Sequence, residues 1–212
     1  MFELFSDRIK ELASSAEKWN DSCLIAVKET EKYSDEKNYK TLPEHLIHEN
    51  ILKSAEMYPD KIAVVDNENT WSYSELMKRA SAVAEELRKK KVERGSYIAV
   101  VMPKSAWQVA AVLGILSEGC AYVPIDAQQA KNRCKLILDN AHIKTILTTS
   151  GYDTGYGDCH TICVDTLPMA DNNILKAEGS LDDVAYVIHT SGSTGVPKGV
   201  VCLLYTSDAA DD

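Results

Sequence analysis

Between residues 43 and 190 the sequence alternates short apolar runs with longer amphipathic stretches, and this alternation most limits the possible folds. Short apolar runs bounded by turn residues predict strands, and longer stretches with apolar side chains every three or four residues predict helices. Strands that alternate with such helices form βαβ units, whose strands run parallel. We therefore predict an α/β fold: an open, mainly parallel sheet with helices on both faces.

The individual elements can be placed from apolar spacing and boundary residues. Ser72 and Glu75 have the spacing of a capping box, which begins a helix, and Gly119 is a residue type that ends one. The residues expected to face the core from the helix after Ser72 are Leu76, Ala80, Val83, Ala84 and Leu87. The expected helices are residues 72–94, 106–116 and 130–141, preceded by a helical stripe of Ile47, Ile51, Ala55 and Tyr58. The expected strands are residues 62–66, 97–102, 121–124, 143–148, 161–164 and 184–189, and a turn at residues 67–69 is expected to lead from the first of them to Thr70 and Trp71.

The first 40 residues have a different character. Residues 2–19 have the apolar spacing of an amphipathic helix, whereas residues 28–40 are polar, mixed in charge and without period, as in a solvated linker. We therefore expect residues 1–40 to be a helix plus linker, and we place a domain boundary near residue 40.

Charge and hydropathy exclude two classes of function. The chain has 23 Lys and Arg against 32 Asp and Glu, a formal charge of −9, so it lacks the basic face of a general nucleic-acid binder. The longest apolar run, residues 109–116, is far shorter than the roughly 20 residues of a bilayer helix. The N-terminus has no basic start followed by an apolar run, as a signal peptide would. We predict a soluble, cytoplasmic chain without nucleic-acid or membrane partners.

The cysteines indicate neither a disulfide framework nor a metal site. The six cysteines are scattered along the chain, and no export signal places them in an oxidising compartment. Cys159, His160 and Cys163 are close in sequence, but a zinc site needs about four ligands and no second pair follows at suitable spacing. We interpret this segment as a loop that leads into a strand, and we predict no metal site.

The segment from Thr190 to Gly199 is the candidate binding site. Its glycines let backbone N–H groups converge on an anion, its hydroxyls donate hydrogen bonds, and Lys198 adds a positive charge after a proline. A strand that delivers such a loop to the edge of a parallel sheet is a common place for phosphate ligands. We predict a polyphosphate cradle formed by Thr190, Ser191, Gly192, Ser193, Thr194, Gly195, Lys198 and Gly199.

Two familiar nucleotide motifs do not fit. Pro197 occupies the position where a Walker loop that begins at Gly192 requires its second glycine. Gly155 and Gly157 are followed by His160, where a dinucleotide fingerprint requires its third glycine. A flexible surface loop and a generic nucleotide-binding module remain as alternatives.

Three segments carry a family resemblance. Residues 186–200 closely resemble the phosphate-loop signature of the adenylate-forming (AMP-binding) superfamily. Residues 71–80 and 116–126 resemble the first two core motifs of amino-acid adenylation domains of nonribosomal peptide synthetases, with Ser117 and Glu118 where that family usually has lysine and alanine. The resemblance covers about residues 43–201 and implies the first part of the large N-terminal subdomain. It gives residues 71–80 and 116–126 an architectural rather than a catalytic role.

The resemblance also implies a reaction. Such enzymes bind ATP with Mg²⁺ and an amino acid, form an aminoacyl adenylate and pass it to the phosphopantetheine thiol of a peptidyl carrier domain. The family's amino-acid pocket, Mg²⁺ ligand and catalytic lysine lie later in the domain, so we expect no catalytic residue here and no activity from this N-terminal fragment alone. His189, where the family usually has an aromatic residue, is expected to pack or stack.

The resemblance also implies a domain plan, and it leaves two alternative functions open. Residues 42–50 resemble the junction between a condensation or heterocyclisation domain and its adenylation domain, so residues 1–40 are expected to end such an upstream domain. Residues 41–201 would be the N-terminal part of the AMP-binding domain. Residues 202–212 depart from the family pattern, and we expect them not to be native. An acyl-CoA or aryl-acid ligase and a catalytically dead interaction fragment remain as alternatives.

Overall fold

The computed structural model describes residues 45–152, 155–156, 159–190 and 197–203. All of them belong to one compact unit, Pro43–Asp212. The predicted helix at residues 2–19, the linker after it and residues 204–212 lie outside the described residues.

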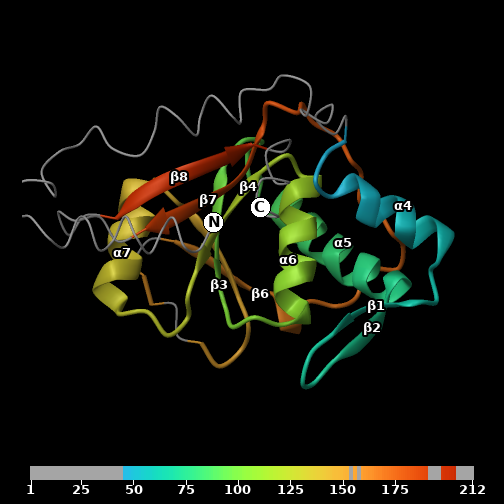
Figure 1. Cartoon of the computed structure of the whole chain (residues 1–212). Helices are drawn as coiled ribbons and strands as arrows, with labels where there is room; N and C mark the ends of the chain where they lie inside the picture. The colour runs from blue at the N-terminus through green and yellow to red at the C-terminus, as the bar shows by residue number, and fades with distance from the viewer. Residues whose placement is uncertain (1–44, 153–154, 157–158, 191–196, 204–212) are drawn as a thin grey trace, which may run out of the picture. The chain divides into compact units, whose positions relative to one another are not determined.

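A six-stranded sheet forms the centre of the unit, in the order β6-β5-β3-β4-β7-β8 (Figure 1). The first five strands in this order pair in parallel, and β8 pairs antiparallel to β7. The open, mainly parallel sheet predicted from the sequence is therefore confirmed. The bounds are β3 (Tyr97–Val101), β4 (Ala121–Ile125), β5 (Thr145–Thr148), β6 (His160–Cys163), β7 (Val184–Thr190) and β8 (Lys198–Leu203).

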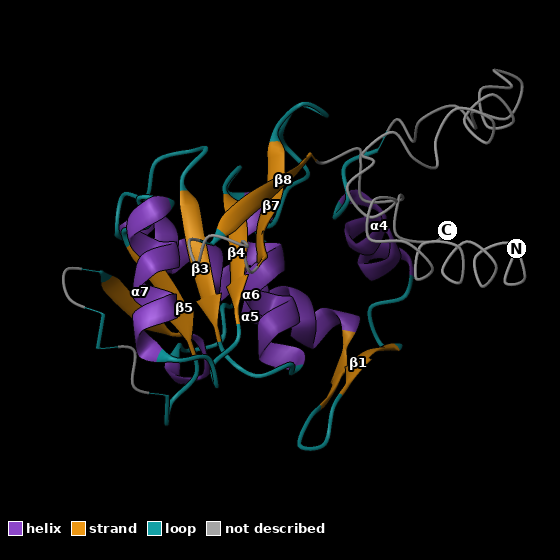
Figure 2. Cartoon of the chain, turned by 60° about the vertical axis from the view of Figure 1, so that its left-hand side comes forward, coloured by secondary structure: helices purple, strands orange, loops and turns teal. Residues whose placement is uncertain are grey.

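Helices cover both faces of this sheet, as predicted (Figure 2). In β3, Ile98 and Val100 share a core with α5 (Tyr73–Lys89) and α6 (Ala106–Ser117). Ala99 and Val101 point the other way and share a core with α7 (Lys131–Asn140). Because successive side chains of a strand point to opposite faces, a strand covered on both sides must be apolar throughout. This explains the uninterrupted apolar run of β3.

Helix α5 begins and packs as its sequence indicates. The Ser72 hydroxyl accepts a hydrogen bond from the Glu75 backbone N–H, and the Glu75 carboxylate accepts one from the Ser72 backbone N–H. All five residues predicted to face the core from this helix are buried. The helix ends at Lys89, five residues earlier than the predicted limit at residue 94.

Helix α6 is buried on most of its surface because it lies against both the sheet and α5. The helices α5 and α6 are closest at Gly114, where a Cβ atom would lie 2.8 Å from the Ala80 carbonyl oxygen and from the Val83 Cβ. The helix ends as predicted, with Gly119 at a φ of +64°.

Two further elements lie beside this core. Strand β1 (Ile62–Val65) was predicted, and after the predicted turn the chain forms β2 (Thr70–Ser72); the two strands form an antiparallel hairpin separate from the main sheet (Figure 2). Helix α4 (Glu49–Met57) buries Ala55, whereas Tyr58, which was expected on the same stripe, is 45% exposed. The helical stripe therefore ends one turn earlier than the spacing suggested.

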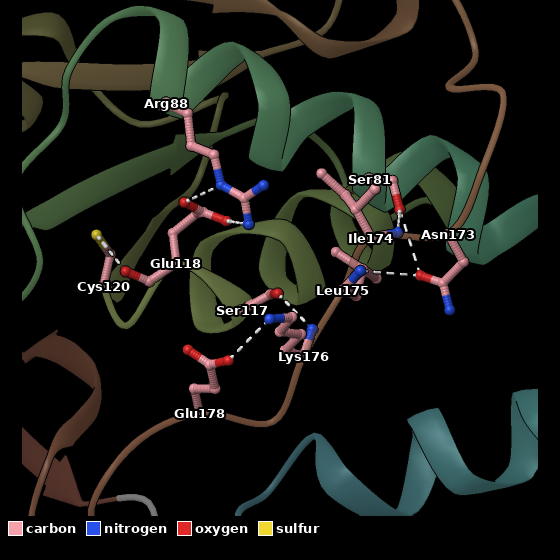
Figure 3. A network of polar contacts seen from close by, with 10 residues as sticks. All are labelled: Ser81, Arg88, Ser117, Glu118, Cys120, Asn173, Ile174, Leu175, Lys176 and Glu178. Atoms are coloured by element: carbon pink, nitrogen blue, oxygen red, sulfur yellow. Dashed lines mark hydrogen bonds and ion pairs between the residues drawn. The ribbon is translucent and has the colours of Figure 1, made fainter.

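A long connection without regular secondary structure, residues 167–183, leads from the short 3-10 helix η1 (Val164–Thr166) to β7. Two buried serines on the helices hold it (Figure 3). The Ser81 hydroxyl accepts a hydrogen bond from the Ile174 backbone N–H, and the Ser117 hydroxyl accepts one from Lys176. This connection, which we call the strap, ties β7 to the helical layer.

Candidate functional site

The β7–β8 hairpin carries the predicted phosphate loop. Thr190 and Lys198 are its last paired residues, and His189 pairs with Gly199. The structure thus places Thr190 and Lys198 opposite each other at the carboxyl end of β7. The other predicted members of the cradle, Ser191, Gly192, Ser193, Thr194 and Gly195, lie outside the described residues.

The element after the loop differs from expectation. Lys198 and Gly199 were assigned to the loop, but they begin β8, a strand that was not predicted. Its signal was present in the apolar residues 200–203, which follow the loop directly. The buried residue Pro197 precedes the strand and fixes the backbone just before Lys198.

A side chain at position 199 would crowd two neighbouring side chains of β7. A Cβ atom on Gly199 would lie 3.0 Å from Cγ1 of Val187 and 3.2 Å from Nε2 of His189. Both distances are shorter than ordinary contacts between carbon and its neighbours. Gly199 therefore lets the His189 imidazole lie close to the backbone of β8, as a packing residue would.

The imidazole of His189 is in an unusual setting. Burial lowers its pKa, and the positive charge of Arg133 lowers this pKa further. Its Nδ1 atom is buried and has no hydrogen-bond partner among the described residues. His189 is therefore neutral near pH 7 and leaves one polar atom unsatisfied next to the loop.

Two cations near this hairpin, Lys198 and Arg133, have no ion pair with any residue that the structure describes. Lys198 is exposed, and in the described part of the chain no carboxylate pairs with it. Arg133, in the first turn of α7, likewise has no ion pair with a described residue. Sequence reasoning did not single out Arg133, because no motif marks it.

A separate hollow of about 550 Å³ lies over the carboxyl ends of β3 and β5. The hairpin turn after β1 closes one side of it: the Asp66 carboxylate accepts a hydrogen bond of 2.7 Å from the Ala106 backbone N–H and so caps helix α6. None of the residues that line this hollow belongs to the predicted cradle, so we do not assign the phosphate site to it.

The segment with Cys159, His160 and Cys163 runs into β6, as interpreted from the sequence. The Cys159 thiol donates a hydrogen bond to the Ile143 carbonyl, and His160 is exposed. Over the described ranges, no group of three or more His, Cys, Asp or Glu side chains could hold a metal ion. Within the same ranges, no helix has the length and apolar character needed to cross a membrane.

Comparison with known proteins gives a consistent match. The family model of the AMP-binding enzymes matches residues 51–203. The chain is 37% identical to phenyloxazoline synthase MbtB of Mycolicibacterium paratuberculosis over 99% of its own length and 18% of that protein. It is 35% identical to pyochelin synthetase PchF of Pseudomonas aeruginosa over 95% of its length and 11% of the synthetase. The chain thus spans less than a fifth of either relative.

Solved structures agree with this match. A nonribosomal peptide synthetase, FmoA3, in its AMPPNP-bound form superposes with a TM-score of 0.73 at 32% identity, over 84% of this chain and 20% of that one. The O-succinylbenzoate coenzyme A synthetase of Bacillus subtilis, in complex with AMP, gives a TM-score of 0.64 at 26% identity, over 72% of this chain and 41% of that one.

Proposed function

Because the chain belongs to the family of AMP-binding enzymes, we propose that it is the N-terminal part of an amino-acid adenylation domain in a nonribosomal peptide synthetase. The complete domain would use ATP to activate an amino acid as its aminoacyl adenylate. The adenylate would then be transferred to the phosphopantetheine thiol of a peptidyl carrier domain.

In this reaction the amino-acid carboxylate attacks the α-phosphorus of ATP, the bond to the bridging oxygen breaks, and pyrophosphate leaves. Negative charge develops on the leaving group, so cations and hydrogen-bond donors held in place around it stabilise the transition state. Lys198 and the Thr190 hydroxyl would act on the departing phosphates together with the loop between them. Mg²⁺ would neutralise phosphate charge, and we place its protein ligands outside this chain.

One observation carries the proposal: Thr190 and Lys198 face each other across the carboxyl end of β7. This strand end lies at the edge of a parallel sheet, where phosphate ligands commonly bind. The hairpin brings Thr190 and Lys198, at the two ends of the predicted loop, opposite each other, and this supports a site at which donors from both ends act on one anion.

We also propose the domain plan expected from the sequence. Residues 1–40 would end an upstream condensation-type domain, and the matches to MbtB and PchF support it because they extend N-terminal to the AMP-binding match. Residues 41–201 would be the start of the adenylation domain. Residues 202–212 would not be native; resequencing of the gene that returns the same codons would overturn this last point.

A second candidate is an acyl-CoA or aryl-acid ligase of the same family. The structural likeness to the O-succinylbenzoate coenzyme A synthetase favours it, although the identity to the peptide synthetases is higher. Substrate dependence of ATP–pyrophosphate exchange separates the two: an adenylation domain responds to one amino acid, and a ligase responds to an aryl or acyl acid and then consumes coenzyme A.

The test of the shared chemistry is Lys198→Ala in the complete synthetase that contains this chain. Removal of one transition-state donor typically costs roughly 100-fold in rate, so exchange should fall by about that factor. Lys135→Ala removes an equal charge from an exposed position on α7 and should leave exchange within about two-fold. The 212-residue chain alone should show no exchange. Unchanged exchange in Lys198→Ala would refute the phosphate-binding role.

A further inference from the structure

We propose that an apolar groove between α4 and α6, together with the neighbouring sheet face formed by Tyr186, Ile188 and Val200, is a docking surface for the segment that follows β8 in the complete protein. The occupant is an amphipathic helix that brings apolar side chains and one polar group. The inference goes beyond the proposed function and rests only on its premise that this chain begins a longer domain, so it does not depend on the substrate.

The groove has a volume of about 370 Å³ and lies between α4, α6 and β4. Its walls are aliphatic and aromatic side chains except for His48 and Gln108, and no charged side chain of the described residues lines it. Apolar hollows with a few convergent polar groups are typical of binding sites. An occupant of this groove must therefore be largely apolar.

His48 is a buried histidine in the wall of this groove. It is 1% exposed, and neither of its ring nitrogens has a hydrogen-bond partner among the described residues. Burial lowers the pKa of His48 more than the Lys176 backbone raises it, so the imidazole is neutral near pH 7, with one donor and one acceptor. Because buried polar atoms are almost always paired, we expect the occupant to place a polar group against His48.

The groove continues into an uncovered face of the sheet. Tyr122, in the groove wall, lies beside Tyr186 of β7, with ring centroids 5.3 Å apart. Ile188 lies two residues after Tyr186 and pairs with Val200 of β8, so these side chains point to the same face. Ile188 is 44% exposed and Val200 is 52% exposed. Since a sheet of this class is normally covered by helices on both faces, a helix is the expected cover.

The position of the end of β8 identifies the occupant. Leu203, the last residue of β8, pairs with Val184. The next residue of β7, Ala185, shares a core cluster with Val112 and Leu116, which line the groove. The chain therefore leaves β8 beside the groove. Because it covers only 41% of the O-succinylbenzoate coenzyme A synthetase structure, a complete enzyme of this family has ample further chain to cover this face.

The first experiment measures exposure in the complete synthetase that contains this chain. Ile188→Cys and Val200→Cys are compared with Leu136→Cys on α7, where Leu136 is 45% exposed and lies over the opposite face of the sheet. Maleimide labelling followed by peptide mass spectrometry gives the reaction rate at each position. We expect both test cysteines to react roughly ten-fold more slowly than the control, because a covered site reacts only when it opens. A test cysteine that reacts as fast as the control would overturn the proposal.

A second experiment identifies the occupant in the same synthetase. The photoreactive residue p-benzoylphenylalanine replaces Gln108 in the groove, and mass spectrometry maps the cross-linked peptide. The expected peptide lies C-terminal to β8 in the same polypeptide. A cross-link to a peptide N-terminal to residue 45, a cross-linked dimer, or no cross-link would each contradict this assignment.

His48→Phe tests the polar contact. It removes both ring nitrogens, and the loss of about one buried hydrogen bond should speed labelling of Ile188→Cys roughly five-fold. Labelling of Leu136→Cys should stay the same, which shows that the fold is intact. An unchanged rate at position 188 would show that His48 has no polar partner in the occupant. Adenylate formation is not a readout here, so exchange in Lys198→Ala decides the proposed function separately.

Discussion

Replacement of Gly114 by alanine should destabilise the protein, although alanine is the better helix former. The new Cβ would lie 2.8 Å from the Ala80 carbonyl oxygen and 2.8 Å from the Val83 Cβ, where ordinary contacts begin at 3.4 Å. Helices α5 and α6 would have to separate by about 0.6 Å (3.4 − 2.8), because neither contact atom is the end of a flexible side chain. Over-packing of this kind costs about 1–3 kcal/mol.

The magnitude follows from two opposing effects. Because the new Cβ would contact rigid atoms, the over-packing cost is at the upper end of this range, about 3 kcal/mol. The higher helix propensity of alanine offsets about 1 kcal/mol of this cost. A net loss of about 2 kcal/mol should lower Tm by about 4–8 °C in a protein of this size.

Urea unfolding followed by tryptophan fluorescence measures the loss. Trp71 and Trp107 contact each other edge to face with ring centroids 4.7 Å apart, and Trp107 lies on α6 itself. Val83→Ala removes the Cγ1 atom that lies 2.9 Å from the new Cβ, so the double variant should lose less stability than the sum of the single variants. A Gly114→Ala protein as stable as the parent would show that the two helices are not locked at this distance.

Two further predictions concern the supports of the fold. Hydrogen bonds from the backbone N–H groups of Ala106 and Glu68 lower the pKa of Asp66 from 3.8 to about 2. The ionised carboxylate therefore stabilises the folded state above pH 4, and this stabilisation is lost as the pH falls toward 2. Between these pH values, the urea midpoint of the parent should fall more steeply than that of Asp66→Asn. Ser81→Ala removes the buried hydroxyl that accepts from the N–H of the partly buried Ile174 and should cost about 1 kcal/mol in the same assay. An equal stability would show that this hydrogen bond does not hold the strap.

The sequence was sufficient where the decisive interactions are local or periodic. Ser72 and Glu75 are three residues apart, so their capping box can be read without any knowledge of the fold. The apolar run at residues 97–102 predicted a strand, and the structure has β3 there, packed against helices on both faces. In both cases a single physical rule connects neighbouring residues to their conformation.

The sequence was not sufficient to predict an interaction whose two partners are distant along the chain. Strands β1 and β2 pair with each other and not with the main sheet. A short apolar run predicts a strand, but it does not predict which other strand it will pair with. The strap has no period at all; it is fixed by hydrogen bonds from Ile174 and Lys176 to serines about 60 to 90 residues away.

The unpredicted strand β8 changes how the proposed phosphate site would work. In a Walker loop the chain continues from the loop into a helix, whose N-terminal N–H groups and dipole stabilise the phosphate charge. Here the chain continues from Pro197 into an antiparallel strand, and strand dipoles largely cancel within a sheet. A phosphate at the proposed site would therefore gain no helix-dipole stabilisation from the element that follows the loop. The compensating positive charge would have to come from side chains, and the exposed Lys198 at the start of β8 is one that this strand supplies.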